Sequence, residues 1–363
     1  MGPAMNAPKD APIVFLVPDI HDLQTGGNVF NRRMVAGLRP ETAVRVQTWA
    51  PDTRPARALD LPDASLIVVD SLLARHPDAL RAVQENTAAT PMILVVHYLR
   101  CIDPYVPDDA ETSGPGGVAD ERAALDAVDG AVTTSRYVKR ALVEEGLPAE
   151  QTQVVRPGLD GRYRRALPAR LGDAAPRMLT VANLLSGKGL RSFVDVLRAL
   201  RGRPWTWTLV GDASLDPAHA AGVFRRLRAA ELTHRVTWTG PIAPEVLRTW
   251  YDRADLFVLP SRFETCSLST REAMARGLPV VGHRVGGMAE NMGGVTAGAL
   301  VPPHDTRSLR AALRSLLCDP MARAQRGRAA WRRSRDFPTW AEAAARFREA
   351  LATLRSRAVG AAP

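Results

Sequence analysis

Residues 261–281 read SRFETCSLSTREAMARGLPVV and carry the clearest structural information in the chain. The apolar run Leu256–Leu259 before them predicts a buried strand, and Glu264 stands in the loop that follows. Leu268–Arg276 then has helical spacing, and Leu278–Val281 predicts another strand. This order of strand, loop, helix and strand is typical of a parallel sheet that binds ligands at the carboxyl ends of its strands.

Two carboxylates lie in this stretch, Glu264 in the loop and Glu272 within the helix. The first backbone N–H groups of a helix have no partner inside it, so they are available to a ligand. Carboxylates accept hydrogen bonds from hydroxyl groups, and free N–H groups donate to anionic oxygens. The segment therefore predicts a site for a ligand rich in hydroxyl groups.

The same alternation of apolar runs and helical spacing extends over the whole chain. The predicted strands of the N-terminal half are Ile13–Pro18, Val44–Trp49, Ser65–Val69, Met92–His97, Gly130–Thr133 and Gln153–Arg156; those of the C-terminal half are Arg177–Val181, Trp205–Val210, Arg235–Thr239, Leu256–Leu259, Leu278–Val281 and Ala299–Val301. Predicted helices between and after them include Asn28–Leu38, Pro77–Ala88, Leu190–Leu200, Ala218–Ala230, Pro244–Ala254, Leu268–Arg276 and Thr339–Ser356. The pattern predicts an α/β protein with two Rossmann-like, doubly wound sheets.

The length of 363 residues suits two such cores, which we expect to face each other across a cleft. We expect a disordered N-terminus at 1–12, a first domain at 13–165, a second at 166–338, and a closing helix at 339–357 that packs on the first domain. The Pro-, Gly- and Arg-rich stretch Arg156–Pro176 predicts the connection. Residues 357–363 are expected to be disordered.

The net charge of +10 is unevenly distributed. Residues 1–165 hold 18 Lys+Arg against 22 Asp+Glu, and residues 166–363 hold 30 against 16. A basic C-terminal half suits a polyanionic partner, but a codon bias towards arginine explains it equally well. The chain has only three lysines, Lys9, Lys139 and Lys188, so a lysine at position 188 is notable.

Several patterns are expected to have no catalytic role. Cys101, Cys266 and Cys318 lie far apart and predict unpaired thiols, and neither the histidines nor the aspartates show metal-ligand spacing. We therefore expect no metal and no cofactor. No apolar run reaches the roughly 20 residues that span a bilayer, and the first residues lack a secretory signal, so a cytoplasmic location is expected. Trp205, Trp207 and Trp238 lie on strand patterns and are predicted to be core residues.

Two loops have the composition of anion sites. Gly26 and Gly27 come between the first strand and the helix at Asn28, where phosphate contact and a plain turn are equally good interpretations. Residues 179–189, LTVANLLSGKG, form a strand, a loop and a helix start, with Lys188 at the mouth of the helix. An ammonium beside free N–H groups favours a diphosphate site there.

Residues 261–281 resemble the Glu-x7-Glu signature of retaining nucleotide-sugar glycosyltransferases with the GT-B fold, the large family four group. The resemblance covers nearly the whole chain, because further features occur in the family's order. These are Gly26-Gly27, His97 at the end of a strand, Ser135-Arg136-Tyr137-Val138, Val155-Arg156-Pro157-Gly158, Lys188-Gly189, Gly286-Gly287 and the helix at Trp340.

The resemblance implies a role for each matching residue. Glu264, Lys188 and His97 would be the catalytic residues, with Glu264 accepting hydrogen bonds from the donor sugar, Lys188 holding the diphosphate, and His97 lining the sugar and acceptor side. Glu272 would bind the ribose of the nucleotide. The donor site as a whole would comprise Gly26, Gly27, Asn183, Lys188, Glu264, Thr265, Cys266, Ser267, Leu268 and Glu272.

The chain departs from the family's pattern at two places. Many relatives have Arg where Asn183 stands, which leaves open the identity of the second cation for the diphosphate. Relatives usually have Gly-Phe-Gly after the first Glu, whereas this chain has Thr265, Cys266 and Ser267. The added side chains are expected to alter the preference for the donor sugar.

The predicted function is metal-independent, retaining transfer of a sugar from a nucleotide diphosphate sugar, with a UDP-sugar as the expected donor. The net acidic N-terminal half favours a soluble small molecule or glycan as acceptor over a lipid, and peripheral membrane contact stays open. Asp103, Asp108, Asp109 and Glu111 after His97 indicate either a polar or cationic acceptor or a solvated loop.

Two alternative functions also fit the sequence, and the sequence does not determine the oligomeric state. A GT-B epimerase or phosphorylase would share the fold and the donor site. A basic protein that binds nucleic acid or anionic membranes would explain the charge, although we expect no nucleic acid partner.

Overall fold

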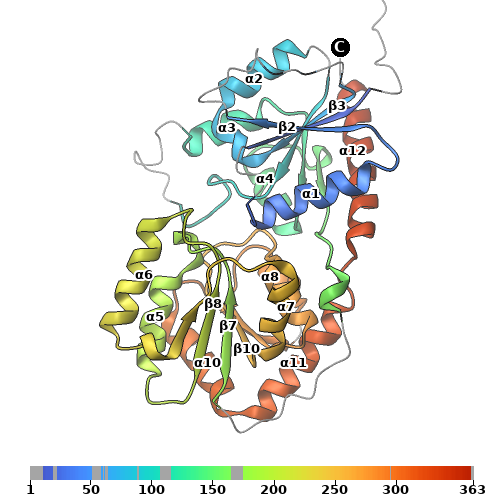
Figure 1. Cartoon of the computed structure of the whole chain (residues 1–363). Helices are drawn as coiled ribbons and strands as arrows, with labels where there is room; N and C mark the ends of the chain where they lie inside the picture. Colours follow the sequence, from blue (N-terminus) through green and yellow to red (C-terminus); the bar gives the residue numbers. More distant parts are fainter. Residues whose placement is uncertain are drawn as a thin grey trace, which may run out of the picture. The chain divides into compact units, whose positions relative to one another are not determined.

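The computed structural model describes residues 11–18, 23–50, 59, 61, 64–87, 90–106, 116–164, 175–294 and 296–360. The chain divides into two units (Figure 1). Unit 1 comprises Met1–Gly158 and Trp340–Pro363, and unit 2 comprises Leu159–Thr339. The expected disorder at residues 1–10 and 361–363 lies outside the described residues.

Unit 1 is built on a parallel sheet with the strand order β2-β1-β3-β4-β5-β6. Its strands are β1 (Ile13–Pro18), β2 (Val44–Trp49), β3 (Leu66–Asp70), β4 (Met92–Val96), β5 (Gly130–Thr133) and β6 (Thr152–Val154). Its helices include α1 (Gly26–Leu38), α2 (Pro77–Asn86), α3 (Val118–Leu125) and α4 (Arg136–Glu144), with short 3-10 turns η2 (Ser71–Arg75) and η3 (Ala149–Gln151). β1, β3 and β4 are buried along their whole length, as expected for parallel strands covered on both faces.

Helix α12 (Trp340–Gly360) belongs to unit 1 although it ends the chain (Figure 1). It packs beside α1, and the ring of Phe347 meets that of Phe30 edge-on at 5.9 Å. Phe347 and Leu354 are fully buried, and each such side chain contributes about 1.5–3 kcal/mol. The helix continues to Gly360, so the expected disorder from Arg357 onward is wrong for residues 357–360.

Unit 2 repeats the architecture with the strand order β12-β11-β10-β7-β8-β9. Its strands are β7 (Arg177–Val181), β8 (Thr206–Val210), β9 (Val236–Trp238), β10 (Leu256–Leu259), β11 (Val280–His283) and β12 (Gly298–Val301). Its helices include α5 (Leu190–Ala199), α6 (Pro217–Ala229), α7 (Pro244–Arg253), α8 (Leu268–Ala275), α9 (Met288–Met292), α10 (Thr306–Cys318) and α11 (Pro320–Ser334), with 3-10 turns η4 (Gly161–Tyr163), η5 (Ser186–Lys188) and η6 (Thr233–Arg235). Two parallel six-stranded sheets with flanking helices confirm the predicted fold class.

Each sheet reverses its strand order once. In unit 1 the chain passes from β1 to β2 on one side and then to β3 on the other, and in unit 2 it passes from β7 through β8 and β9 before β10 returns to the other side of β7. The connections leave the two strands at such a reversal in opposite directions, which opens a crevice at their carboxyl ends. The fold therefore places one candidate site beside β1 and β3 and another beside β7 and β10.

The three tryptophans predicted to be core residues divide into two groups. Trp205 and Trp207 are 2% and 1% exposed, and their indole N–H groups donate to Leu200 O and Thr180 Oγ1. Trp238 is 43% exposed, so that prediction is wrong. It lies on β9, which is the edge strand of its sheet, and the ring contacts Phe224 at 5.0 Å.

None of the helices within the described ranges is both long enough and apolar enough to cross a membrane.

Candidate active site

The carboxyl ends of β7 and β10 bring together two loops of unit 2. Lys188 ends η5, with Gly189 between it and α5, and the loop after β10 carries Ser261 and Glu264. Gly189 has a φ of 67°, and a Cβ at this position would lie 2.0 Å from the carbonyl oxygen of Pro260. Only glycine allows this approach, so the lysine loop is pressed against the end of β10.

Lys188 and Glu264 form an ion pair in this crevice. Lys188 Nζ lies 2.7 Å from Glu264 Oε1, which also accepts a 2.6 Å hydrogen bond from Ser261 Oγ. The side chain of Glu264 is 8% exposed and that of Lys188 is 26% exposed. No group among the described residues donates to the other carboxylate oxygen, Oε2. The pair thus combines a held carboxylate that keeps one acceptor oxygen with a cation that remains accessible.

Two glycines fix the backbone beneath Glu264. Gly286 has a φ of 47°, and a Cβ there would lie 1.9 Å from Glu264 O. The N–H of Gly287 donates to the same carbonyl at 2.7 Å. The Gly286-Gly287 pair therefore acts by allowing a second loop to hold the backbone of the carboxylate residue.

Glu272 lies on α8, one loop away from Glu264. Its Oε2 accepts a 2.7 Å hydrogen bond from the hydroxyl of Tyr251, which comes from α7. Burial raises the pKa of Glu272 to about 7, and the tyrosine hydrogen bond opposes this shift. A carboxylate with a pKa so far above its usual value is a common feature of binding and catalytic sites.

In unit 1 the crevice beside β1 and β3 is lined by the start of α1 and by the residue after β4. α1 begins at Gly26, and Thr25 caps it by accepting a 3.1 Å hydrogen bond from Asn28 N. A Cβ on Gly27 would lie 2.7 Å from Cγ of His97. Gly27 therefore lets the first turn of α1 come into contact with the imidazole ring.

A chain of hydrogen bonds holds His97. Its Nε2 lies 2.8 Å from Asn31 Oδ1, and Asn31 Nδ2 donates to Asp70 Oδ2 at 2.6 Å. Asp70 also accepts from Leu72 N at 2.8 Å, and His97 N donates to Ser71 Oγ at 3.0 Å. Burial lowers the pKa of His97, with Asp70 acting in the opposite direction. Because Asn31 Oδ1 can only accept, Nε2 carries the proton of a neutral imidazole.

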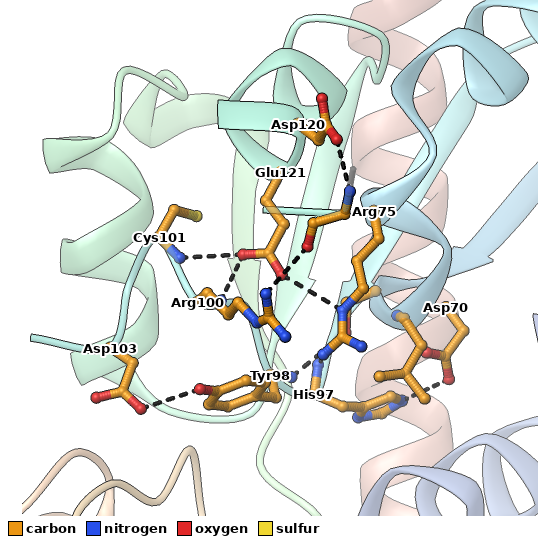
Figure 2. Close-up of polar contacts among 12 residues, drawn as sticks. Asp70, Arg75, His97, Tyr98, Arg100, Cys101, Asp103, Asp120 and Glu121 are labelled. Atoms are coloured by element: carbon orange, nitrogen blue, oxygen red, sulfur yellow. Dashed lines mark hydrogen bonds and ion pairs between the residues drawn. The ribbon is translucent and has the colours of Figure 1, made fainter. Parts of the chain in front are cut away.

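The loop after His97 is anchored by a buried carboxylate on α3 (Figure 2). Glu121 is 1% exposed and accepts hydrogen bonds from the backbone N–H groups of Arg100 and Cys101, while Arg75 Nε lies 3.7 Å from its other oxygen. Further along the loop, Tyr98 donates to Asp103 at 3.1 Å. Asp108, Asp109 and Glu111 lie outside the described residues.

Known proteins resemble this chain in sequence and in fold. The profile of the family described as glycosyl transferases group 1 matches residues 175–319, which include Lys188, Glu264 and Glu272. The D-inositol 3-phosphate glycosyltransferase of Kineococcus radiotolerans is 30% identical over 272 residues, which make up 68% of this chain and 62% of that protein. The sucrose-phosphate synthase of Thermosynechococcus elongatus superposes with a TM-score of 0.76 and 20% identity, over 93% of this chain and 98% of that one. Residues 175–319 therefore match the group 1 glycosyl transferases, and the chain as a whole has the GT-B fold.

A second solved structure shares the architecture. Anabaena HepE, in complex with UDP and glucose, superposes with a TM-score of 0.75 and 19% identity, over 94% of this chain and 99% of HepE. This chain spans less than two thirds of the length of the curated relatives that it matches. For the Kineococcus enzyme the share is 62%.

The first departure from the glycosyltransferase pattern concerns Asn183. Its Oδ1 accepts a 3.1 Å hydrogen bond from the backbone N–H of Asp212, so it ties the loop after β7 to the loop after β8. Arg262 lies beside the lysine loop, because its backbone N–H donates to Gly187 O at 2.8 Å. Within the described ranges, no acidic side chain forms an ion pair with Arg262. Its guanidinium is therefore a candidate for the second cation.

The second departure is the Thr265-Cys266-Ser267 segment. Ser267 has a φ of 62°, a conformation that favours glycine, and it directly precedes α8. Its Oγ bonds Thr270 Oγ1 at 2.8 Å, and Asn291 Nδ2 donates to the carbonyls of both Cys266 and Ser267. The Cys266 thiol is buried, which raises its pKa. Asn291 thus helps to hold a turn that glycine would form with less strain.

Among the residues of these arrangements that were not predicted from the sequence are Asn31, Glu121 and Tyr251. Each acts through a contact with a distant segment, and each lies in a helix where polar residues are common.

No group of three or more His, Cys, Asp or Glu side chains that could hold a metal ion occurs in the part of the chain that the structure describes.

Proposed function

We propose that this chain transfers a sugar from a nucleotide diphosphate sugar to a soluble small-molecule or glycan acceptor, with retention of anomeric configuration and without a metal ion. The observation that carries the proposal is the 2.7 Å pair of Lys188 and Glu264 at the reversal point of the unit 2 sheet. It joins a cation suited to a diphosphate with a carboxylate oxygen suited to sugar hydroxyl groups.

The reaction requires charge stabilisation on the leaving group. As the bond between the anomeric carbon and the diphosphate oxygen breaks, negative charge grows on the phosphate, and Lys188 and the backbone N–H groups at the start of α5 stabilise it. Arg262 would supply the second positive charge. The acceptor hydroxyl attacks from the face that the diphosphate leaves, and a phosphate oxygen takes its proton, which preserves the configuration.

The carboxylates and the histidine orient the reactants. Glu264 Oε2 accepts hydrogen bonds from the donor sugar, and Glu272 accepts them from the ribose. His97 is kept neutral by burial and donates its Nε2–H to Asn31, so its Nδ1 can accept a hydrogen bond from a sugar or acceptor hydroxyl without adding charge beside an oxocarbenium-like centre.

UDP is the nucleotide to test first, since HepE was solved in complex with it. A thermal-shift screen of UDP, GDP, ADP and their sugars tests the donor site. A ligand at 100 times its dissociation constant adds about 2.7 kcal/mol to the free energy of unfolding. UDP is expected to raise the melting temperature, and absence of stabilisation by every nucleotide would contradict the proposal.

Product analysis tests the remaining parts. NMR of the product is expected to show the donor's anomeric configuration, and turnover is expected to persist in EDTA. An inverted anomer, or an activity that only a divalent ion restores, would contradict the mechanism. Incubating the UDP-sugar without acceptor, with and without phosphate, separates a transferase from an epimerase or a phosphorylase.

A further inference from the structure

Tyr251 is a buried polar residue whose hydroxyl ends on a carboxylate of the donor site. It lies on α7, its side chain is fully buried, and the rings of Tyr163 and Phe257 flank it at 5.6 and 6.1 Å. Packing of this kind leaves the phenol ring one orientation. The hydroxyl therefore has a fixed position relative to α8.

The two oxygens of Glu272 have different surroundings. Oε2 accepts the 2.7 Å hydrogen bond from Tyr251, and no other donor to this carboxylate occurs among the described residues. Glu272 is only partly buried, whereas Tyr251 is completely buried. The carboxylate is therefore held from the inside by one oxygen, and Oε1 is left for a ligand.

We propose that Tyr251 is a positioning residue for nucleotide recognition: it fixes the carboxylate of Glu272 through one oxygen so that the other accepts hydrogen bonds from the ribose hydroxyl groups of the donor. The inference rests on the proposed function, because it takes a nucleotide as the ligand of Glu272. A glutamate has three side-chain torsions, and ordering them before the ligand arrives lowers the entropic cost of binding.

The charge state of Glu272 also supports a positioning role for Tyr251. Burial raises its pKa, and the hydrogen bond from Tyr251 lowers it. Tyr251 therefore favours the ionised carboxylate, in which both oxygens act only as acceptors. A protonated carboxyl group would lose one of these acceptor positions.

Calorimetric titration of two proteins with two nucleotides tests the proposal. The probes are UDP and 2′,3′-dideoxy-UDP, or the matching pair for GDP or ADP if that base stabilises the wild type most. The wild type is expected to prefer the ribonucleotide. Tyr251→Phe removes only the hydroxyl and is expected to reduce this preference by roughly 3- to 10-fold, through weaker binding of the ribonucleotide alone.

Tyr163→Phe is the matched control. Tyr163 is buried against Tyr251, but its hydroxyl forms no hydrogen bond with any described residue, so Tyr163→Phe is expected to leave the preference unchanged. If Tyr251→Phe does not fold, Tyr251→Met, an adaptable side chain without a hydroxyl, is measured instead and is expected to give the same loss.

Each result has a distinct meaning. Equal weakening of both nucleotides would show that Tyr251 merely supports the core and would overturn the proposal, as would an unchanged preference or an equal loss in Tyr163→Phe. Failure of the wild type to bind any nucleoside diphosphate would instead contradict the proposed function. Wild-type binding with an unaltered Tyr251→Phe would remove only the role of Tyr251.

Discussion

The two crevices use their carboxylates in opposite ways. In unit 2, Glu264 and Glu272 each hold protein donors with one oxygen, and the other oxygen has no donor among the described residues. In unit 1, both oxygens of Asp70 and Glu121 have protein partners. The side chain that unit 1 offers is instead His97, kept neutral by burial.

The difference predicts which carboxylates bind a ligand and which hold the scaffold together. A desolvated carboxylate with an unused acceptor costs free energy unless something binds it, and such costs are tolerated at functional sites. A carboxylate whose oxygens are all used holds loops in place. Changes in unit 2 should therefore affect donor binding and turnover, and changes in the unit 1 scaffold should affect stability and acceptor use.

The largest expected effect is in unit 2. Lys188→Ala removes the cation that we propose contacts the diphosphate and is expected to lower kcat/KM by about 100- to 1,000-fold, because a preorganised charge on the leaving group is lost. Steady-state kinetics and UDP titration measure it. Lys139→Ala is the matched control, since the bonds of Lys139 to described residues go to the backbone carbonyls of Ala149 and Thr152 in unit 1, and its kcat/KM should stay near the wild-type value. A Lys188→Ala enzyme with more than a third of wild-type kcat/KM would contradict the assignment.

The next effect tests the contact between α1 and His97. Gly27→Ala adds a Cβ 2.7 Å from His97 Cγ, so the ring must move, and kcat is expected to fall about 10- to 100-fold. Turnover at saturating donor, with the imidazole resonances of His97, reports on it. Gly202→Ala places its Cβ in open space and serves as control. Wild-type turnover in Gly27→Ala would mean that the position of His97 does not matter.

A change at a scaffold carboxylate should have a different effect from the changes at Lys188 and Gly27. Glu121→Gln weakens the hold on the backbone of Arg100 and Cys101 and is expected to cost about 1–3 kcal/mol of unfolding free energy. Acceptor KM should rise, while stabilisation by UDP should stay as in the wild type. Urea unfolding and acceptor kinetics measure these quantities. If Glu121→Gln binds UDP more weakly while its free energy of unfolding is unchanged, the distinction between scaffold and ligand carboxylates is wrong.

The smallest effect is a pH dependence at Glu272. Its pKa of about 7 arises mainly from burial, and the polar groups that act on it are Tyr251, Asp160 and Arg162, with Tyr163 packed nearby. Ionisation favours acceptance of ribose hydroxyl groups, so the preference for UDP over 2′,3′-dideoxy-UDP should increase as the pH rises through about 7, by roughly 3- to 10-fold.

The comparison of the two nucleotides cancels the titration of the diphosphate itself. Tyr251→Phe should move the midpoint to higher pH, because the tyrosine hydrogen bond lowers the pKa of Glu272. A preference that stays constant from pH 6 to pH 8 in the wild type would exclude this role for Glu272.

Much of the fold was predictable because its signals are local. β1, β2, β5, β7 and β10 begin and end where the apolar runs predicted, and α5, α7 and α8 differ by one residue at most. The prediction that Trp238 is a core residue failed, because the apolar alternation of a strand does not show whether that strand lies at the edge of its sheet. The predicted start of α1, Asn28, is two residues late, because the sequence alone does not distinguish Thr25, which caps the helix, from the loop before it.

The candidate site likewise has one part that the sequence predicts and another that depends on tertiary structure. The spacing of Glu264 and Glu272 within one loop and helix is a property of the sequence, since a few residues of backbone join them. That Lys188, 76 residues from Glu264, reaches its carboxylate depends on β7 and β10 being neighbours in the sheet. Asn31 beside His97 and Tyr251 beside Glu272 likewise depend on helix packing. Periodicity encodes which face of an element is buried, but the partner across that face is decided only when the elements pack, because contact energies depend on distance in space and not along the chain.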